Sequence, residues 1–329
     1  MNGIKDNLLT IIIPTYNRES FLDYSLSKLS EYNKIYSFSL IVCDNASTDG
    51  TSEVIERWKT SFSEFKYIRQ SNNVGYAKNV TVGYLVVETD YCWVLGDSYL
   101  FSEQALSIIL KTLSGRHPDA IILNNEINVL DFMPDRYCKV DDILATIGWY
   151  LTLLCSCIVS RDFISEEVIR RYVDTRFLHL GVFIDHLCFL ESFEVICLKE
   201  AQVDPIKLGI NKSPKNRASW QHTPFKVFAE GWFQFVMSLP NTIPLPIKLK
   251  CIKDHDKKSH IFYPLRIFAL RMERYLSYTD YWECRKYMYW VTEHSIWLYD
   301  LIYFCPPMPK IICYLKKQSI IEKLKSVIS

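Results

Sequence analysis

The first 125 residues alternate between short apolar runs and amphipathic segments, and no other feature of the sequence constrains the fold as strongly. The apolar runs are rich in β-branched residues, as in strands that are buried on both faces. Between them, apolar residues recur at helical spacing, for example Leu22, Leu26 and Leu29. Such alternation across short loops predicts an α/β fold with a mostly parallel sheet flanked by helices. The predicted strands cover residues 8–13, 40–43, 66–69, 91–95 and 120–123.

The composition of the 329 residues excludes several other classes of protein. Hydrophobic residues make up 49% of the chain, which is enough for a packed core. The net charge of +1 does not suggest a nucleic-acid partner. Eleven cysteines without a C-x-x-C pair favour a reducing cytoplasm over a disulfide framework. For the uncharged run 143–159 we expect a buried helix followed by a buried strand, because it is short for a membrane span.

Polar side chains follow four of the predicted strands. The carboxyl ends of parallel strands share one edge of the sheet, and ligands bind there. The chain has neither G-x-G-x-x-G nor G-x-x-x-x-G-K-[ST], so a glycine-rich phosphate loop is not indicated. A carboxylate such as Asp44 can accept hydrogen bonds from a base or ribose, and helix N-termini can face phosphate oxygens. In strand order the polar residues are Thr15, Asn17 and Arg18; Asp44, Asn45 and Asp49; Asn72 and Asn73; and Asp97.

Three blocks of sequence together resemble glycosyltransferase family 2. They are IIIPTYNR (11–18), IVCDNASTDGT (41–51) and NNVGYAKN (72–79). The resemblance implies the GT-A fold, a nucleotide-diphospho-sugar donor and transfer with inversion, with Asp44 on the base or ribose. A capping role and a contact with the donor are equally consistent with the types of Asn45, Ser47 and Thr48. For Asp49 we expect a role as the cap of the next helix. The implied donor-binding residues are Pro14, Thr15, Tyr16, Asn17, Arg18, Asp44, Asn45, Asn73, Gly75, Lys78, Gly96 and Asp97.

The segment WVLGDSY (93–99) occupies the place of the D-x-D motif of the family and departs from it. Asp97 fills the first aspartate position, and Tyr99 stands where the last is expected. The resemblance implies Mg²⁺ or Mn²⁺ at Asp97, neutralising the charge that develops on the leaving diphosphate. Two alternatives remain: Asp97 and the donor diphosphate hold the metal together, or a Lys or Arg replaces it. The candidate cations are Lys212, Lys215 and Arg217 of a polar loop.

An inverting transferase also needs a base for the acceptor hydroxyl. The resemblance implies a carboxylate in the second half of the chain, and Asp185 in LGVFIDH is the candidate. Apolar surroundings make a carboxylate a stronger proton acceptor. Glu191 is the rival, His179 and His186 lie near in sequence, and a capping role for Asp185 is the structural alternative.

The C-terminal part of the chain is basic and aromatic. From Lys248 to Ser329 there are 15 Lys or Arg and 8 Asp or Glu, a net of +7 that leaves −6 for the remainder. Aromatic residues at helical spacing between Trp282 and Tyr303 favour a packed core. The Lys residues among Ile and Leu from Lys310 onward favour contact with a membrane surface. The resemblance adds that polysaccharide-building members often use lipid-linked acceptors at the inner face of the membrane.

The sequence therefore predicts a cytoplasmic hexosyl- or related sugar transferase, peripheral at the inner face of the plasma membrane. Its acceptor would be a lipid-linked or surface glycan of the O-antigen (lipopolysaccharide) or capsule type. One alternative is a non-catalytic nucleotide-sugar-binding protein, which Tyr99 keeps open. The other is a sugar-nucleotidyl transferase, which would need a glycine-rich loop after the first strand. The predicted regions are 1–125 for the donor, 126–225 for acceptor and catalysis, and 226–329 for the helical, aromatic and basic end.

Overall fold

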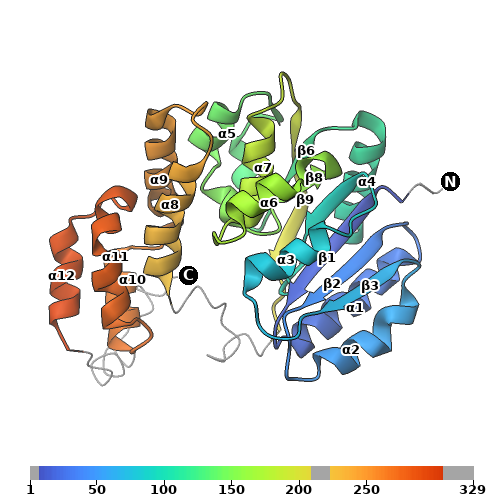
Figure 1. The fold of residues 1–329 in the computed structure, drawn as a ribbon, viewed down its shortest axis with the longest axis horizontal. Helices are drawn as coiled ribbons and strands as arrows, with labels where there is room; N and C mark the ends of the chain where they lie inside the picture. The colour runs from blue at the N-terminus through green and yellow to red at the C-terminus, as the bar shows by residue number, and fades with distance from the viewer. Residues whose placement is uncertain (1–6, 209–222, 307–329) are drawn as a thin grey trace. The chain divides into compact units, whose positions relative to one another are not determined.

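The computed structural model describes residues 7–208 and 223–306, which divide into two compact units (Figure 1). The first unit contains residues 7–208 and 239–243, and the second contains 223–238 and 244–306. The strands, all in the first unit, are β1 (Leu9–Thr15), β2 (Ser39–Asp44), β3 (Phe65–Arg69), β4 (Tyr91–Val94), β5 (Tyr99–Phe101), β6 (Ala120–Asn124), β7 (Arg136–Tyr137), β8 (Cys157–Ser160) and β9 (Val195–Pro205).

Helices accompany these strands and make up the second unit. In the first unit they are α1 (Glu19–Asn33), α2 (Thr51–Trp58), α3 (Tyr76–Tyr84), α4 (Glu103–Arg116), α5 (Val140–Thr146), α6 (Glu166–Tyr172) and α7 (Leu178–Leu187). Short 3₁₀ turns cover Lys59–Ser61, Val129–Phe132, Tyr150–Thr152 and Arg161–Phe163. The second unit has a π-helical segment (Phe225–Gly231), α8 (Trp232–Ser238), α9 (Leu245–Ser259), α10 (Pro264–Met272), α11 (Tyr278–Val291) and α12 (Ile296–Phe304).

Within the described residues the strands form one sheet in the order β3-β2-β1-β4-β8-β6-β9-β5, with β7 paired to β9. The first four strands in this order are parallel neighbours. Thr15 lies opposite Asp44, and Asp44 lies opposite Arg69. The predicted α/β fold is confirmed, and the strand ends that the sequence singled out lie side by side.

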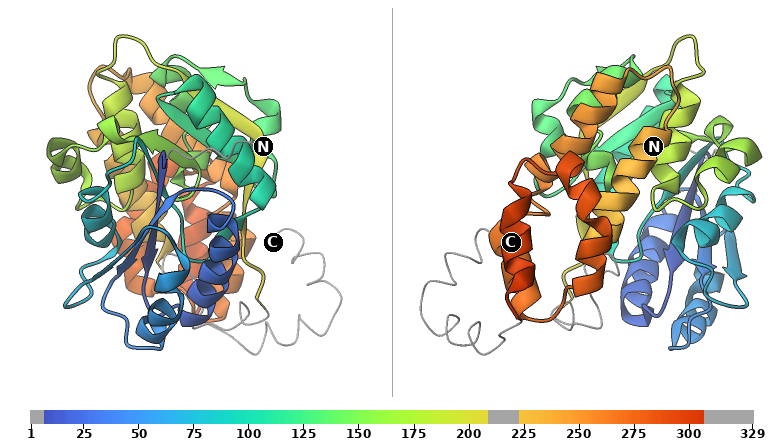
Figure 2. Two further views of the ribbon diagram at one scale, coloured as in Figure 1. Left: turned by 90° about the vertical axis from the view of Figure 1, so that its right-hand side faces the viewer. Right: turned by 60° about the vertical axis from the view of Figure 1, so that its left-hand side comes forward.

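Alternate residues of β1 face different helices, as expected of a strand covered on both sides. Ile11 and Ile13 belong to the core cluster that includes Leu22 and Leu26 of α1. On the other face, a Cβ at Gly83 of α3 would lie 2.7 Å from Ile12. Figure 2 shows α1 and α2 on one side of these strands and α3 on the other.

The second half of the sheet is mixed, because β8 runs antiparallel between β4 and β6. The uncharged run 143–159 contributes to this part. It contains the end of α5, a 3₁₀ turn and most of β8, with Ile143, Leu144 and Ile158 buried. The buried helix and buried strand are therefore present, but a turn separates them. No helix in residues 7–208 and 223–306 is long and apolar enough to cross a membrane.

The second unit packs around aromatic rings. Phe225 contacts Phe262 at 5.5 Å between ring centroids, and Tyr281 stacks on Tyr303 at 4.2 Å. The expected aromatic core is correct for Tyr299 and Tyr303, which are buried. It is wrong for Tyr289, Trp290 and Trp297, whose exposed fractions are 68%, 41% and 57%. The predicted basic tail from Lys310 lies outside the described residues.

Candidate active site

The loops after β1 and β2 are joined by hydrogen bonds at the carboxyl edge of the sheet. The backbone N–H of Asn45 donates to the carbonyl of Thr15 at 3.0 Å. The N–H of Asn17 donates to Ser47 Oγ at 2.9 Å, and the N–H of Thr48 donates to Asn17 Oδ1 at 2.7 Å. Ser47 and Thr48, which the sequence left between capping and contact, therefore connect the two loops.

Asp44 lies beneath these loops with no exposed surface. Its Oδ1 accepts the backbone N–H of Ser47 at 2.8 Å, and its Oδ2 accepts the hydroxyl of Tyr67 at 2.9 Å. Arg69 Nε lies 3.6 Å from the same Oδ2. The carboxylate thus caps the turn and ties β2 to β3. Tyr67 and Arg69 carried no signal in the local sequence, because their role depends on strand pairing.

Asn45 connects the loop after β2 to the loop after β3. Its Nδ2 donates to Asn73 Oδ1 at 2.9 Å, and its Oδ1 accepts the N–H of Val74 at 2.9 Å. Asn73 Oδ1 also accepts the N–H of Gly75 at 3.0 Å. Asn73 and Gly75 are exposed, so they can meet a ligand directly. Lys78, in the first turn of α3, pairs with Asp174 at 3.4 Å between exposed side chains.

Each of the first three loops contains a residue with a positive φ angle. They are Asn17 (53°), Ala46 (63°) and Gly75 (85°). Glycine and asparagine tolerate this region, whereas for Ala46 it costs about 1–2 kcal/mol. Such residues concentrate at functional sites, where surrounding contacts hold the strained conformation.

Asp97 joins the fourth strand end to the first. Thr15 Oγ1 donates to Asp97 Oδ2 at 3.0 Å, and Ser25 Oγ donates to the carbonyl of Asp97 at 3.2 Å. Burial raises the pKa of the Asp97 carboxyl to about 6, while the positive charge of Arg18 and the hydrogen bond from Thr15 act in the opposite direction. Arg18 is therefore a cation beside the carboxylate that the D-x-D resemblance selected.

The described residues do not make a metal site by themselves. Tyr99 stands in β5, and burial raises the pKa of its phenol, so it stays neutral and is a weak ligand. No group of three or more His, Cys, Asp or Glu in the described part of the chain could hold a metal ion. Asp97 is thus a single carboxylate, and we derive no step through Mg²⁺ or Mn²⁺. The candidate cations Lys212, Lys215 and Arg217 lie outside the described residues.

The remaining predicted donor residues lie around this edge. Pro14 is half-buried at the end of β1, and Tyr16 is 44% exposed. A Cβ at Gly96 would approach the Tyr99 ring to 3.3 Å, so glycine leaves room for that ring. Asp49 accepts hydrogen bonds from the backbone N–H of Thr51 and of Glu19, consistent with its expected capping role.

Asp185 lies in the second half of α7 and forms an ion pair with α6. Both carboxylate oxygens accept from Arg171 Nη1, at 2.6 and 2.9 Å, and Oδ1 accepts the Tyr172 hydroxyl at 2.7 Å. The Asp185 side chain is 1% exposed, and that of Arg171 is 35% exposed. The capping alternative is wrong, because Asp185 is not at the start of the helix. The pair links two helices.

The other candidates of this segment differ in exposure. Glu191 is exposed beyond the end of α7. His186 stacks on Phe163 at 4.2 Å, and burial lowers its pKa. His179 connects α7 to the start of α3, because the Tyr76 hydroxyl lies 3.4 Å from its Nδ1. Burial lowers the pKa of His179 to about 4, so it is neutral near pH 7.

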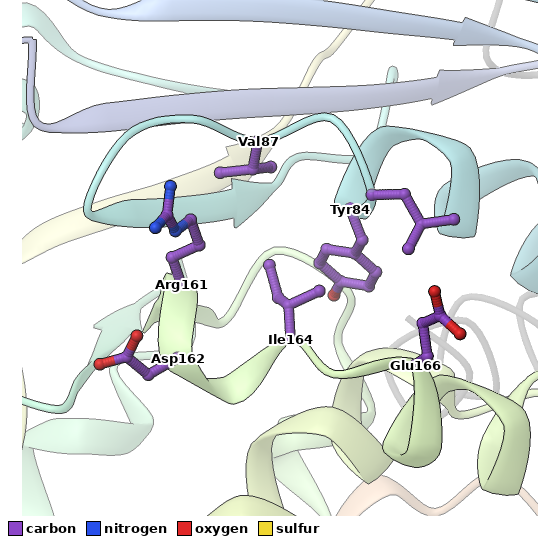
Figure 3. A pocket seen from close by; sticks show the side chains of 7 residues that line it. Tyr84, Val87, Arg161, Asp162, Ile164 and Glu166 are labelled. Carbon is purple, nitrogen blue, oxygen red and sulfur yellow. The ribbon is translucent and has the colours of Figure 1, made fainter.

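A cavity of about 410 Å³ lies at the opposite end of β4 (Figure 3). Tyr84 and Val87 precede β4, and Arg161 follows the antiparallel β8, whose last residue pairs with the first of β4. The cavity is therefore at the amino end of the strand that carries Asp97 at its carboxyl end. It does not belong to the candidate site.

Comparisons with known proteins agree with this geometry. A family model described as glycosyl transferase family 2 matches residues 10–140. The abequosyltransferase RfbV of Salmonella typhimurium is 33% identical over 112 residues, which is 33% of each chain. Chondroitin synthase of Escherichia coli is 36% identical over 64 residues, which is 20% of this chain and 9% of the relative. The matched segments thus span a third or less of the length of these two relatives.

Solved structures resemble a larger part of the chain. TarS 1–349 of S. aureus in complex with UDP-GlcNAc has a TM-score of 0.59 at 14% identity, over 86% of this chain and 81% of that one. The mannosyltransferase PcManGT of Pyrobaculum calidifontis, in complex with GDP-Man and Mn²⁺, has a TM-score of 0.55 at 12% identity, over 97% and 82%. At these identities the likeness establishes the fold.

The sheet, with its polar loops at the carboxyl edge, defines a protein of the GT-A class. Within that class, residues 10–140 match the model of glycosyltransferase family 2.

Proposed function

We propose that the chain is an inverting glycosyltransferase that moves a sugar from a nucleotide-diphospho-sugar to a glycan acceptor. The observation that carries the proposal is the hydrogen-bonded edge of the sheet. There Asn17, Ser47, Asn45 and Asn73 tie the three family blocks together, and Thr15 ties Asp97 to the same edge. The similarity to an abequosyltransferase supports an O-antigen or capsule glycan as the acceptor, lipid-linked or at the surface.

In the proposed reaction the acceptor hydroxyl attacks the anomeric carbon as a base removes its proton. The bond from that carbon to the diphosphate oxygen breaks, and the nucleoside diphosphate leaves. Arg18 is the described cation that acts on Asp97, so we assign it to the negative charge of the diphosphate. The exposed Asn73 and Gly75 would contact the donor from the loop after β3.

We propose Asp185 as the base, with the Arg171 ion pair opening when substrates bind. The ion pair complicates the usual test, because Asp185→Asn alone leaves Arg171 without its counter-charge. A double variant, Arg171→Gln with Asp185→Asn, replaces the pair by neutral groups of similar size. We expect both variants to lose turnover by at least 100-fold and to keep donor binding. Turnover restored by the double variant would assign Asp185 a purely structural role and leave Glu191 as the candidate.

The proposed activity is tested first by thermal shift with UDP-, GDP-, CMP- and dTDP-sugars, with and without Mg²⁺ or Mn²⁺. A ligand that binds only the folded state raises the melting temperature. We expect one nucleotide class to stabilise the protein, and Arg18→Gln to abolish that stabilisation. A shift that needs metal would assign the charge of the diphosphate to a metal at Asp97. A shift without metal would support Arg18.

Assays of hydrolysis and transfer with the stabilising donor separate the alternative functions. Donor binding without either activity would indicate a non-catalytic nucleotide-sugar-binding protein, the alternative that Tyr99 leaves open. The sugar-nucleotidyl transferase gains no support, because the loop after β1 is Tyr16-Asn17-Arg18 and contains no glycine. We extend the proposal to a peripheral position at the inner face of the plasma membrane, which the basic, aliphatic sequence from Lys310 onward supports.

A further inference from the structure

The cavity at the amino end of β4 lies within the first unit and apart from the donor loops. Its volume of about 410 Å³ is in the range of small-molecule sites, roughly 300–1,000 Å³. Two segments that are far apart in the chain form its walls, residues 84–87 and residues 161–166 (Figure 3). We call this space the β4 cavity. Its lining combines one cation, two acids, a phenol and aliphatic side chains.

The phenol is the hydroxyl of Tyr84, which is buried without a partner. Tyr84 is 4% exposed, and its hydroxyl forms no hydrogen bond with any described residue. Burial raises the pKa of this phenol well above its usual value, so the group keeps its proton near neutral pH. A buried hydroxyl without a partner destabilises the folded chain. Because Tyr84 lines the cavity, a ligand there would supply the missing acceptor.

The cation is Arg161, on the turn that follows β8. Its backbone N–H donates to the carbonyl of Asp90 at 2.8 Å, and its Nη1 donates to the carbonyl of Glu88 at 3.2 Å. These contacts fix the guanidinium beside the start of β4. Figure 3 shows the side chain extending toward Val87. Within residues 7–208 and 223–306 Arg161 has no ion-pair partner, so its remaining N–H groups can bind a carboxylate.

The two acids, Asp162 and Glu166, are exposed. Glu166 pairs with Arg170 at 3.1 Å, but both side chains are 76% exposed, and water weakens such a pair. Asp162 forms no ion pair with the part of the chain that the structure describes. A positively charged group in the cavity would therefore find a carboxylate at its open side.

The remaining lining is aliphatic and consists of Leu85, Val87 and Ile164. Val87 is 8% exposed, and Ile164 is half-buried. The β4 cavity thus offers a site for an anion, a site for a cation and an apolar wall. An α-amino acid with an aliphatic side chain carries the three matching groups on one carbon, since its carboxyl and amino groups are both ionised near pH 7.

We propose that the β4 cavity binds an α-amino acid with an aliphatic side chain. Its carboxylate accepts hydrogen bonds from the Arg161 guanidinium and the Tyr84 hydroxyl. Its ammonium group meets Asp162 or Glu166, and its side chain lies on the aliphatic wall. This inference goes beyond the proposed transferase activity and does not depend on it, because the cavity is at the opposite end of β4 from Asp97.

The test is isothermal titration calorimetry of the full chain with L-leucine. Two analogues, 4-methylpentanoate and 3-methylbutylamine, keep the aliphatic part and each lack one charged group. We expect leucine to bind and each analogue to bind about tenfold more weakly or less, because hydrogen bonds to charged groups are the strong ones. Arg161→Gln should weaken leucine binding by a similar factor.

A matched pair of variants separates ligand binding from stability. Tyr84→Phe removes only the unpartnered hydroxyl, so it should weaken leucine binding about fivefold and leave the urea unfolding midpoint unchanged or higher. Tyr137→Phe removes a hydroxyl that lies 2.8 Å from Thr146 Oγ1, away from the cavity. It should lower the unfolding midpoint and keep the affinity for leucine.

The proposal is overturned if leucine does not bind, or if Arg161→Gln binds leucine as tightly as the original chain. Equal affinity for leucine and either analogue would also overturn it, because one of the two charged contacts would then be absent. A lower unfolding midpoint in Tyr84→Phe would show that this hydroxyl has a partner inside the protein, which contradicts its assignment to the ligand.

Discussion

The two units both bury polar side chains, but they use them differently. In the first unit, Asp44 and Asn45 are buried where strands end, and their hydrogen bonds run between loops that also carry exposed residues. In the second unit, Asp256 is buried between helices. It accepts the N–H of Phe262 at 2.8 Å and the hydroxyl of Thr292 at 2.5 Å.

This difference indicates which buried polar groups support ligand binding and which determine how helices pack. At a sheet edge, satisfied polar groups shape loops that a ligand can reach. Between helices, the same chemistry fixes which faces meet. Substitutions at the sheet edge should therefore change ligand binding more than stability, whereas those between the helices should change stability alone.

The largest effect should come from Asp256→Ala. It leaves the buried N–H of Phe262 without its acceptor and removes the bond from the hydroxyl of Thr292, at a cost of about 3 kcal/mol in the free energy of unfolding. Urea unfolding measures this cost. Thr292→Val, which leaves Asp256 its bond from Phe262, should cost less. If Asp256→Ala reduced the donor-induced thermal shift while the protein stays folded, the proposed difference between the two units would be wrong.

The next effect should come from Gly83→Ala, where α3 packs on β1 and β2. The new Cβ would lie 2.7 Å from Ile12 and 2.9 Å from Cys43, and overpacking of this kind costs about 2 kcal/mol. The matched control is Gly115→Ala in α4, where nothing lies within 4 Å of the new Cβ, so stability should not fall. Equal unfolding midpoints for the two variants would contradict the packing of α3 on β1 and β2.

His255 should make stability depend on pH in the second unit. Burial lowers its pKa to about 3, and its ring stacks on Phe228 at 4.7 Å. Below pH 6.5 His255 therefore binds a proton in the unfolded state but not in the folded state. The free energy of unfolding falls as the pH falls. Between pH 7 and 5.5 this amounts to about 1.3 kcal/mol. His255→Phe should remove that part of the slope, and an unchanged slope would show that His255 is not its source.

The smallest effect on stability, together with a strong effect on donor binding, should come from Asn45→Ala. It removes the links to Asn73 and Val74 at a cost of about 1 kcal/mol. Because the exposed loop after β3 loses its support, the donor-induced thermal shift should fall strongly. Gln202→Ala removes another side-chain link, to Asn128 at 2.6 Å, and serves as the control. Equal donor-induced thermal shifts in the two variants would show that donor binding does not depend on the hydrogen bonds of Asn45 to the loop after β3.

Much of the first unit could be predicted from sequence. The runs 8–13 and 40–43 lie almost entirely within β1 and β2, because a strand buried on both faces has a local signature. The convergence of Thr15, Asp44 and Asp97 at one edge followed from parallel pairing alone. The antiparallel insertion of β8 was not predicted, since strand order depends on contacts between segments that are distant in the chain.

The site residues were predictable to a different degree. The sequence named Asp44 and Asn45, but the structure decided that Asp44 is held by Tyr67 and Arg69 of the neighbouring strand. In the same way, nothing near Asp185 in the sequence indicated its ion pair with Arg171, which lies on α6.

The sequence by itself determined which segments become strands or helices and which polar groups follow the strands. These properties arise from apolar periodicity and from residues that stop a strand. Only the tertiary structure decided which partner each buried charge finds, and which face of α12 is buried. Tyr299 and Trp297 are two residues apart in one apolar helix, yet one packs in the core and the other is exposed. The packing of α12 against its neighbouring helices makes that choice, and no local pattern contains it.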